Sequence, residues 1–390
     1  MEFSWDVLRE RAFEAIDHRS EAMIELSERL ADNPEIAFQE HRAVEWISEV
    51  FAGMGFSIEK PYGGLETAFR ARLVHSSKGP NLGFLVEYDA LPELGHACGH
   101  NTKGASTWGA VAGILAAMPE LPGAITVVGT PAEETGGGKI IMANEGAFDD
   151  LSVALALSVA PTNMTGLRTL AAQEFVMTFQ GRAAHAEARP GEGRNALTAC
   201  VATFSLVDGL RAGFASDARV NGIVLQGGES TGAIPERAVA VFNVACLDED
   251  NHLGLVDQIH GCAEAGSRAT GCTVDIEPRL LYRPMRLNRP LIRLIRRKMQ
   301  EIGLEVCSAG FGGGTGRTDL GNVSHVVPVD TVWIGIGNDL MPHTPQYLAA
   351  CRSEAGHRAI INGARVGALC GLEIFNRPQT LQEIQEEFES

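Results

Sequence analysis

The sequence predicts an α/β protein that carries an inserted α+β domain, and two observations support this prediction. Helical patterning over residues 7–53 is followed by alternating strands and helices up to about residue 168, as expected of a sheet built from βαβ units. From residue 169 to 282 the predicted order becomes β-α-β-β-α-β, the ferredoxin-like arrangement. We therefore expect residues 1–168 and 283–390 to form one domain and residues 169–282 an inserted one.

The individual elements follow from apolar runs and the residues that interrupt them. In the first domain, the runs Leu82–Val86 and Ile125–Thr130 are typical of buried strands, and the Ala- and Gly-rich segment 102–118 between them is typical of a helix that packs closely on a sheet. In the inserted segment we expect strands at 174–179, 221–227, 238–247 and 273–280, and helices at 195–211 and 253–270. After it we expect a helix at 290–302, a strand at 332–336 and a long helix at 353–375.

Acidic side chains follow two of the predicted strands. Glu87 and Asp89 come directly after the first strand, and Glu133 and Glu134 come after the second. Open α/β sheets bind ligands at the carboxyl ends of their strands, so both pairs are expected at one crevice. Adjacent carboxylates repel each other unless a cation lies between them. The pattern therefore favours a bound cation.

A Cys-x-His segment, Cys98 to His100, lies between the two acidic segments, near the start of the predicted helix. Thiolate, imidazole and carboxylate are the usual ligands of zinc-like cations. Taken alone, a cysteine and a histidine two residues apart are equally consistent with ordinary core residues. Together with Glu133 and Glu134, they indicate a metal site.

These motifs resemble the aminoacylase and carboxypeptidase G type of metal-dependent amidohydrolases. The chain looks most similar to the branch that holds aminobenzoyl-glutamate hydrolases, auxin-conjugate hydrolases and β-alanyl-lysine-type dipeptidases. The resemblance runs from about Leu26 to Pro378. Its most specific segments are 89–101, 131–134, 181–186, 195–197, 318–325 and 342–344. It implies a zinc-exopeptidase-like three-layer catalytic domain, with the inserted domain serving as a lid and dimerisation domain.

The resemblance also implies roles for individual residues in the catalytic domain. By matching position, Cys98, His100, Glu134 and His343 would be metal ligands. Glu133 would be the general base that takes a proton from water and passes it to the leaving nitrogen. The metal would be zinc or manganese, with one or two ions per chain.

Further roles follow from the same matching. His185, in the inserted domain, would stabilise the oxyanion, often across a dimer interface. The residues expected to contact the substrate are Asn195, Arg194, Thr318 and Asp319. Glu87 and Asp89 are expected to contact the metal ligands and orient them.

Three positions depart from the family pattern. Where members carry a histidine that completes the ligand set of a second metal, either Ser158 or Ala160 occupies the place in this chain, and neither replaces an imidazole well. Where they carry an Asn and an Arg that hold the substrate carboxylate, it has Gly232 and Ala245. A full two-metal site is therefore in question, and so is the way in which a substrate carboxylate is held.

The function expected from these observations is hydrolysis of the amide bond in a small N-acyl amino acid, dipeptide or aryl amide. The departures leave two alternatives open. One is an enzyme of altered chemistry, such as hydrolytic deamination or biosynthetic acyl transfer. The other is a non-catalytic binding protein on the same scaffold.

Composition narrows the choice of partners. The formal net charge of −17 argues against nucleic acid, which needs clustered Lys and Arg, and gives no support for an anionic membrane. The first residues lack the basic start and apolar core of a signal peptide, and the eight cysteines show no Cys-x-x-Cys spacing. We therefore expect a cytoplasmic protein with a small-molecule substrate. The family resemblance further implies a homodimer formed through residues 169–282. The glycine-rich run 310–316 is expected to form a flexible wall of the active site rather than a phosphate loop.

Overall fold

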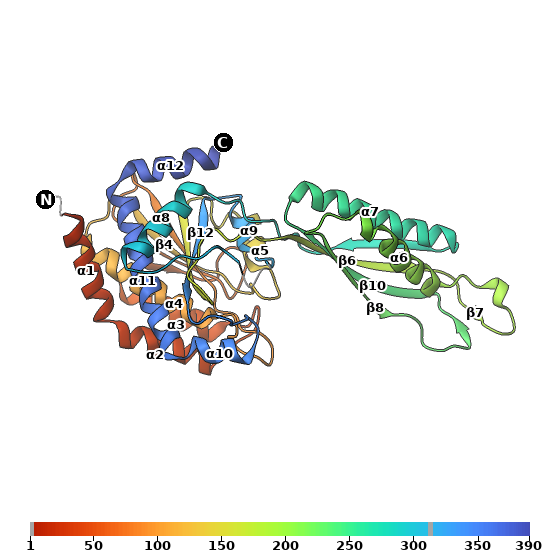
Figure 1. Cartoon of the computed structure of the whole chain (residues 1–390). Helices are drawn as coiled ribbons and strands as arrows, with labels where there is room; N and C mark the ends of the chain where they lie inside the picture. The colour runs from red at the N-terminus through yellow and green to blue at the C-terminus, as the bar shows by residue number, and fades with distance from the viewer. Residues whose placement is uncertain (1–3, 311–314) are drawn as a thin grey trace. The chain divides into compact units, whose positions relative to one another are not determined.

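The computed structural model describes residues 4–310 and 315–390, and the chain divides into two compact units (Figure 1). Unit 1 comprises Met1–Arg168 and Met285–Ser390, and unit 2 comprises Thr169–Pro284. The inserted unit thus ends at Pro284, two residues after the end at residue 282 that the sequence predicted. Most of the expected glycine-rich wall, residues 311–314, lies outside the described residues.

Within the described part of unit 1, six strands form one sheet in the order β1-β2-β4-β3-β5-β12. Their bounds are β1 Ser57–Glu59, β2 Phe69–Val74, β3 Asn81–Val86, β4 Ala124–Gly129, β5 Val153–Ala160 and β12 Val329–Gly335. The last four are parallel, and β3, β4 and β5 are buried at every residue. Burial on both faces explains why these strands are continuous apolar runs in the sequence. Because β3 and β4 are parallel neighbours, the segments that follow them leave the sheet side by side.

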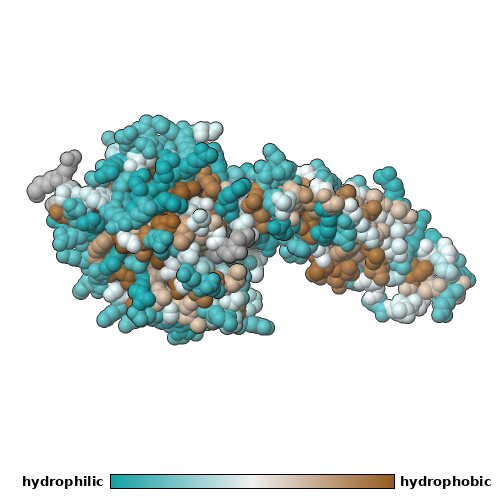
Figure 2. All heavy atoms as spheres, in the orientation of Figure 1, coloured by the Kyte–Doolittle hydropathy of each residue, from teal (hydrophilic) through white to brown (hydrophobic). Residues whose placement is uncertain are grey.

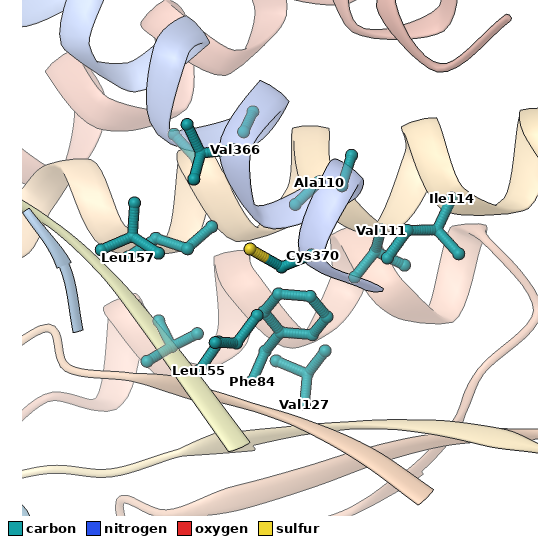
Figure 3. Packing of buried hydrophobic residues seen from close by; sticks show 14 of the residues in the cluster. Phe84, Ala110, Val111, Ile114, Val127, Leu155, Leu157, Val366 and Cys370 are labelled. Atoms are coloured by element: carbon teal, nitrogen blue, oxygen red, sulfur yellow. The ribbon is translucent and has the colours of Figure 1, made fainter. Parts of the chain in front are cut away.

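Helices cover both faces of this sheet. The helices in the described part of unit 1 are α1 Trp5–Asp17, α2 Ser20–Asp32, α3 His41–Gly53, α4 His100–Ala117, α5 Gly138–Asn144, α8 Arg289–Glu301, α9 Leu320–Val323, α10 Pro345–Cys351, α11 Glu354–Asn376 and α12 Pro378–Glu389. On one face, Phe84 and Leu155 of the sheet pack against α4 and α11, as Figure 3 shows. On the other face, Leu85 packs with Phe148 and with Leu320 of α9. The result is the three-layer α/β arrangement expected from the sequence.

Small residues let α4 approach its neighbours closely. A Cβ on Gly109 would lie 2.4 Å from Met23 Cε of α2 and 2.8 Å from Ala364 Cβ of α11. Since real side chains do not approach so closely, this position in the middle of α4 requires glycine. The close contact fixes α4, whose first residue is His100, against the rest of unit 1.

Unit 2, all of whose residues are described, has a four-stranded antiparallel sheet in the order β11-β6-β10-β8. Its main elements are β6 Ala171–Gln180, α6 Ala196–Leu210, β8 Arg219–Gln226, β10 Arg237–Cys246, α7 Glu249–Ala269 and β11 Thr273–Pro278. This is the predicted β-α-β-β-α-β order. Phe175, Met177 and Phe242 of the sheet form a core with apolar residues of α6 and α7.

The sequence did not reveal several short or solvent-facing elements. In unit 1 these are the antiparallel strands β1 and β2 and the helices α5, α9, α10 and α12. In unit 2 they are the short pair β7 Ala184–His185 and β9 Ala233–Ile234 and the two 3₁₀ turns Pro190–Glu192 and Arg211–Gly213. Two-residue strands carry no periodic signal that could predict them.

No helix in the described ranges is long and apolar enough to cross a membrane. The cytoplasmic location expected from the sequence stays a prediction.

Asp330 on β12 makes the stability of unit 1 depend on pH. Its side chain accepts hydrogen bonds from Thr165 Oγ1 at 2.7 Å and from the Gly166 backbone N at 2.9 Å. Burial nevertheless raises the pKa of Asp330 to about 6, against 3.8 for an unburied carboxyl. As pH rises, the unfolded chain therefore loses this proton first, and stability falls between about pH 4 and pH 6.

We predict that the native chain loses stability relative to Asp330→Asn as pH rises. The unfolding free energy of the native chain minus that of the variant should fall by up to about 3 kcal/mol from pH 4 to pH 7. Guanidinium unfolding at several pH values measures it. Thr165→Val removes a hydrogen bond that stabilises the ionised form, so the decline should extend above pH 6 in that variant. A difference that does not change with pH would contradict the prediction.

Candidate metal centre and catalytic site

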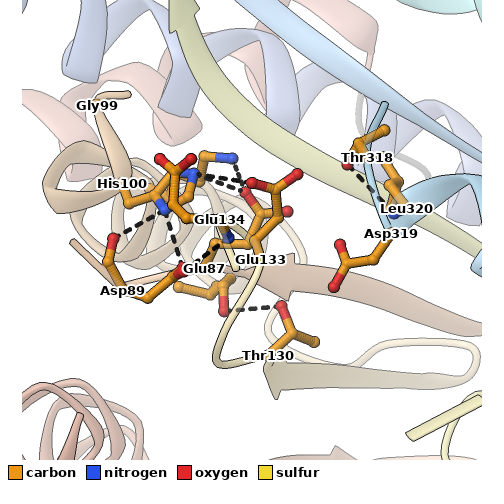
Figure 4. Close-up of polar contacts among 12 residues, drawn as sticks. Glu87, Asp89, Gly99, His100, Thr130, Glu133, Glu134, Thr318, Asp319 and Leu320 are labelled. Atoms are coloured by element: carbon orange, nitrogen blue, oxygen red, sulfur yellow. Dashed lines mark hydrogen bonds and ion pairs between the residues drawn. The ribbon is translucent and has the colours of Figure 1, made fainter. Parts of the chain in front are cut away.

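The side chains singled out in unit 1 meet where the chain leaves β3 and β4 (Figure 4). Glu87 and Asp89 follow β3, Glu133 and Glu134 follow β4, and His100 opens α4. His100 Nε2 lies 3.3 Å from Glu87 Oε2 and 3.9 Å from Glu133 Oε2. The structure therefore brings together the acidic groups of both strand ends around one buried imidazole.

Asp89 fixes the geometry of this group. One oxygen, Oδ1, lies 3.0 Å from His100 Nδ1, and the other, Oδ2, accepts a hydrogen bond of 2.8 Å from the Glu134 backbone N. The same His100 nitrogen lies 2.9 Å from the Asp89 carbonyl oxygen. With Nδ1 donating to these oxygens, the lone pair of a neutral His100 is on Nε2, as in metal-binding histidines held by a carboxylate.

Cys98, His100 and Glu134 form a compact donor set. One ligand atom from each, the Cys98 sulfur, a ring nitrogen and a carboxylate oxygen, lies within 4.8 Å of the others. His343 adds a fourth donor, because its Nε2 lies 3.3 Å from Glu134 Oε2. The other oxygen of Glu134, Oε1, is buried and has no hydrogen-bond partner among the described residues. A buried acceptor without a donor is costly unless a cation satisfies it.

Unusual backbone conformations place these donors. Gly99, between the two ligand candidates on this segment, has φ +80°, and a Cβ there would lie 2.3 Å from Val159 Cγ2. His343 has φ +65°, and its backbone N donates to Ala97 O at 2.9 Å. The loop of His343 is thereby tied directly to the loop of Cys98.

A buried carboxylate holds the turn that carries Glu133 and Glu134. Ala132, just before them, has φ +60°, a conformation that non-glycine residues rarely adopt. Its backbone N donates a hydrogen bond of 2.9 Å to Glu40 Oε1. Burial raises the pKa of Glu40 to about 7. Glu40 precedes α3, so a distant part of the chain positions the paired glutamates.

Glu133 is a base with little access to water. Its side chain is 13% exposed, and burial, with Glu87 and Asp319 adding negative charge, raises its pKa to about 8. A carboxylate destabilised in this way takes up protons readily near neutral pH.

Two buried lysines complete the cluster, and both were missed from the sequence. Lys103, one turn into α4, forms an ion pair with Glu87 Oε2. Lys139 Nζ lies 2.7 Å from both Glu87 Oε1 and Asp319 Oδ1. Burial alone would raise the pKa of Glu87, but the two ammonium groups outweigh it and hold that pKa below the ordinary range. A lysine on the same turn as a candidate ligand was the available sequence signal.

Comparison with known proteins places the chain in a family. The sequence model of the protein family described as "Peptidase family M20/M25/M40" matches residues 83–358. The chain belongs to this peptidase family. The resemblance inferred from the sequence is confirmed, and the protein is a hydrolase that acts on amide C–N bonds.

The similarity to relatives and solved structures extends over most of the chain. A Xaa-Arg dipeptidase from Mus musculus is 35% identical over 98% of this chain and 92% of its own length. One of the subunits of the p-aminobenzoyl-glutamate hydrolase of Escherichia coli is 24% identical over 96% of this chain and 93% of its own length. A Bacillus subtilis protein described as a dinuclear metal-binding peptidase of the M20 family shares the fold, with a TM-score of 0.72, 17% identity and coverage of 92% of this chain and 99% of its own.

The remaining predicted residues of this M20 chain have contacts within their own units. In unit 2, His185 is exposed, and its Nδ1 accepts hydrogen bonds from the backbone of Glu187 and Ala188. Asn195 caps α6 by accepting from Thr198 N at 3.1 Å, and Arg194 donates to Gly271 O. Their predicted roles stay predictions.

In unit 1, the side chains of Thr318 and Asp319 have hydrogen-bond partners within the protein. The Thr318 hydroxyl accepts from Leu320 N at 3.2 Å, and Asp319 accepts from Lys139. Asp319 therefore holds the start of α5.

The three departures from the family pattern have ordinary surroundings. Ser158 is 4% exposed, pairs with Trp333 across the sheet, and its hydroxyl has no partner within residues 4–310 and 315–390. Ala245 is buried in β10, and Gly232 lies in an exposed turn of unit 2. None of them provides a replacement ligand or carboxylate holder.

We predict that Asp89→Asn weakens divalent metal binding about 10–100-fold, because the residue orients His100 and Glu134 without needing to touch the ion. Competition with a chromophoric chelator measures the affinity. Asp330→Asn, which makes the same change at another buried carboxyl of unit 1, should leave it unchanged. Equal affinity in both variants would contradict the positioning role of Asp89.

Proposed function

We propose that this M20 chain is a metal-dependent dipeptidase in which Glu133 is the general base. The observation that supports it most directly is the donor set of Cys98, His100 and Glu134 within 4.8 Å, with Glu133 next to it in the chain. Of two adjacent carboxylates, one faces the donors and the other is free to carry a proton. This division of roles is what amide hydrolysis requires.

The proposed ligands of the metal are Cys98, His100, Glu134 and His343. A thiolate with two imidazoles and one carboxylate favours zinc over manganese, which prefers oxygen ligands. The unpartnered Glu134 Oε1 and the Asp89 contact to His100 support the fit. A bound divalent cation lowers the pKa of a water molecule and polarises the scissile carbonyl.

Glu133 performs the proton transfers in this proposal. Its ionised side chain takes a proton from the attacking water and donates it to the departing amine nitrogen. The raised pKa suits both steps, because the group can exist in either protonation state near neutral pH. Its limited exposure keeps bulk water from exchanging with the proton in transit.

The substrate class follows from the relatives. The Mus musculus relative, at 35% identity over 98% of this chain, is a Xaa-Arg dipeptidase. A Homo sapiens protein of the same name is 32% identical over the same share of the chain. We therefore propose dipeptides with a carboxyl-terminal arginine as the first substrates to assay, followed by N-acyl amino acids.

We predict that Glu133→Gln lowers kcat on such dipeptides by about 10²–10⁴-fold, because the amide cannot accept the proton of water. The metal content should stay at the native value, since Glu133 is not a proposed ligand. Product formation followed by chromatography, with metal measured by mass spectrometry on the same samples, tests both statements.

Glu134→Gln serves as the matched comparison. It should lose activity together with metal, whereas Glu133→Gln loses activity alone. Native turnover in the Glu133 variant would refute its role as the base.

We further propose a homodimer formed through unit 2. The edge strand β8 exposes Ile223, Val224 and Leu225 to 60%, 45% and 58%. Leu206 and Leu210 of α6 are also exposed, and Figure 2 shows hydrophobic side chains gathered on this unit. An unpaired apolar edge strand invites pairing with a second copy of the same chain.

We predict that Ile223→Asp combined with Leu225→Asp converts a dimer into a monomer of 41.6 kDa, because charges on the edge oppose its pairing. Light scattering at micromolar concentration measures the mass. Val74→Asp, at an apolar position of unit 1 that is 47% exposed, is the control and should stay dimeric. A native chain that is already monomeric would contradict the dimer.

A further inference from the structure

Two buried ammonium groups lie on one side of the catalytic cluster. The side chains of Lys103 and Lys139 are 5% and 0% exposed, and they pair with Glu87 and Asp319, which are 5% and 0% exposed. Buried ammonium groups are tolerated only where carboxylates compensate them. The two lysines therefore supply two positive charges that are permanent parts of the fold.

Most charges of the cluster pair off on one of two sides, the lysine side and the donor set. Two ammonium groups balance Glu87 and Asp319. One divalent cation balances the Cys98 thiolate and the Glu134 carboxylate, with two neutral imidazoles completing its ligands. The two ammonium groups offset the charges of Glu87 and Asp319, so this pair of carboxylates has no charge left to attract a second divalent cation. Glu133, the proposed base, and Asp89, which faces His100, are not part of this pairing.

A second cation also lacks its ligand. The position at which the family carries an imidazole is Ser158 or Ala160. The buried hydroxyl of Ser158 has no partner among the described residues, and the side chain of Ala160 has no donor atom. The strand neighbour of Ser158 is Trp333, and Lys103 Nζ lies 5.9 Å from the centre of that ring. A positive charge thus lies against the same tryptophan that borders the missing ligand.

We infer that this chain binds one divalent cation, and that the ammonium group of Lys103 takes the place of a second. The related Bacillus subtilis peptidase is described as dinuclear. In this inference the missing imidazole and Lys103 belong together. Without the imidazole a second metal ion is not held, and Lys103 supplies the positive charge that this ion would have provided. The inference rests on the proposed metal centre and specifies its stoichiometry.

The experiment is a metal count. Zinc(II) is added to metal-stripped protein, and binding is followed by calorimetry, with metal per chain measured by mass spectrometry after dialysis. The native chain should hold one equivalent. Two tight equivalents would leave the metal centre intact and refute the inference. No bound metal would refute the proposed centre itself and the inference with it.

Substitutions test the coupling. Ser158→His alone should still bind one equivalent, because the ammonium of Lys103 repels a second ion. Ser158→His together with Lys103→Met should bind two, the second about 100-fold tighter than in Ser158→His alone. A second equivalent in Ser158→His alone, or none in the double variant, would refute the role of Lys103.

A matched control separates charge from the general effect of removing a buried lysine. Lys298, on α8, is 5% exposed, and its Nζ lies 2.7 Å from Glu373 Oε2, far along the chain from the ligand candidates. Ser158→His with Lys298→Met should keep one equivalent. If a variant fails to fold, the count on the native chain still decides between one ion and two.

Discussion

Negative charge crowded into a buried crevice is the constraint on which the rest of unit 1 depends. Five carboxylates lie there or at its border: Glu87, Asp89, Glu133, Glu134 and Asp319. Asp89 has an imidazole and a backbone N–H, whereas Glu87 and Asp319 have ammonium groups. These partners come from α4, α5 and the loop after β4. Satisfying the charges therefore fixes the relative positions of those elements.

The parts of this arrangement that repeat along the sequence could be predicted from it. The buried strands β3, β4 and β5 are continuous apolar runs, and parallel packing places their carboxyl ends together. The apolar runs alone were therefore enough to predict that the acidic groups after β3 and β4 lie at one crevice, where the structure has them. The β-α-β-β-α-β order of unit 2 followed from the change of period after residue 168 in the same way.

What could not be predicted depends on contacts between residues far apart in the chain. A lysine in a helix normally faces water. Apart from the position of Lys103 one turn after His100, nothing local shows that Lys103 and Lys139 are buried against carboxylates. The carboxylate of Glu40 acts on Ala132, 92 residues later, so its role is visible only in three dimensions. Ser158 could be recognised as a departure from the family, but no local pattern indicates the cation nearby.

The division of unit 1 into two pieces has a consequence for synthesis of the chain. Its sheet has β5 next to β12, yet residues 161–328, which include all of unit 2, separate these strands. A nascent chain therefore presents the apolar β5 edge unpaired until β12, at residues 329–335 of 390, leaves the ribosome. Unit 2, which is continuous in sequence, can fold during that interval, whereas the crevice is completed last, when the segment with Asp319 and His343 arrives. A chain truncated before β12 would keep an aggregation-prone edge and a fold without function.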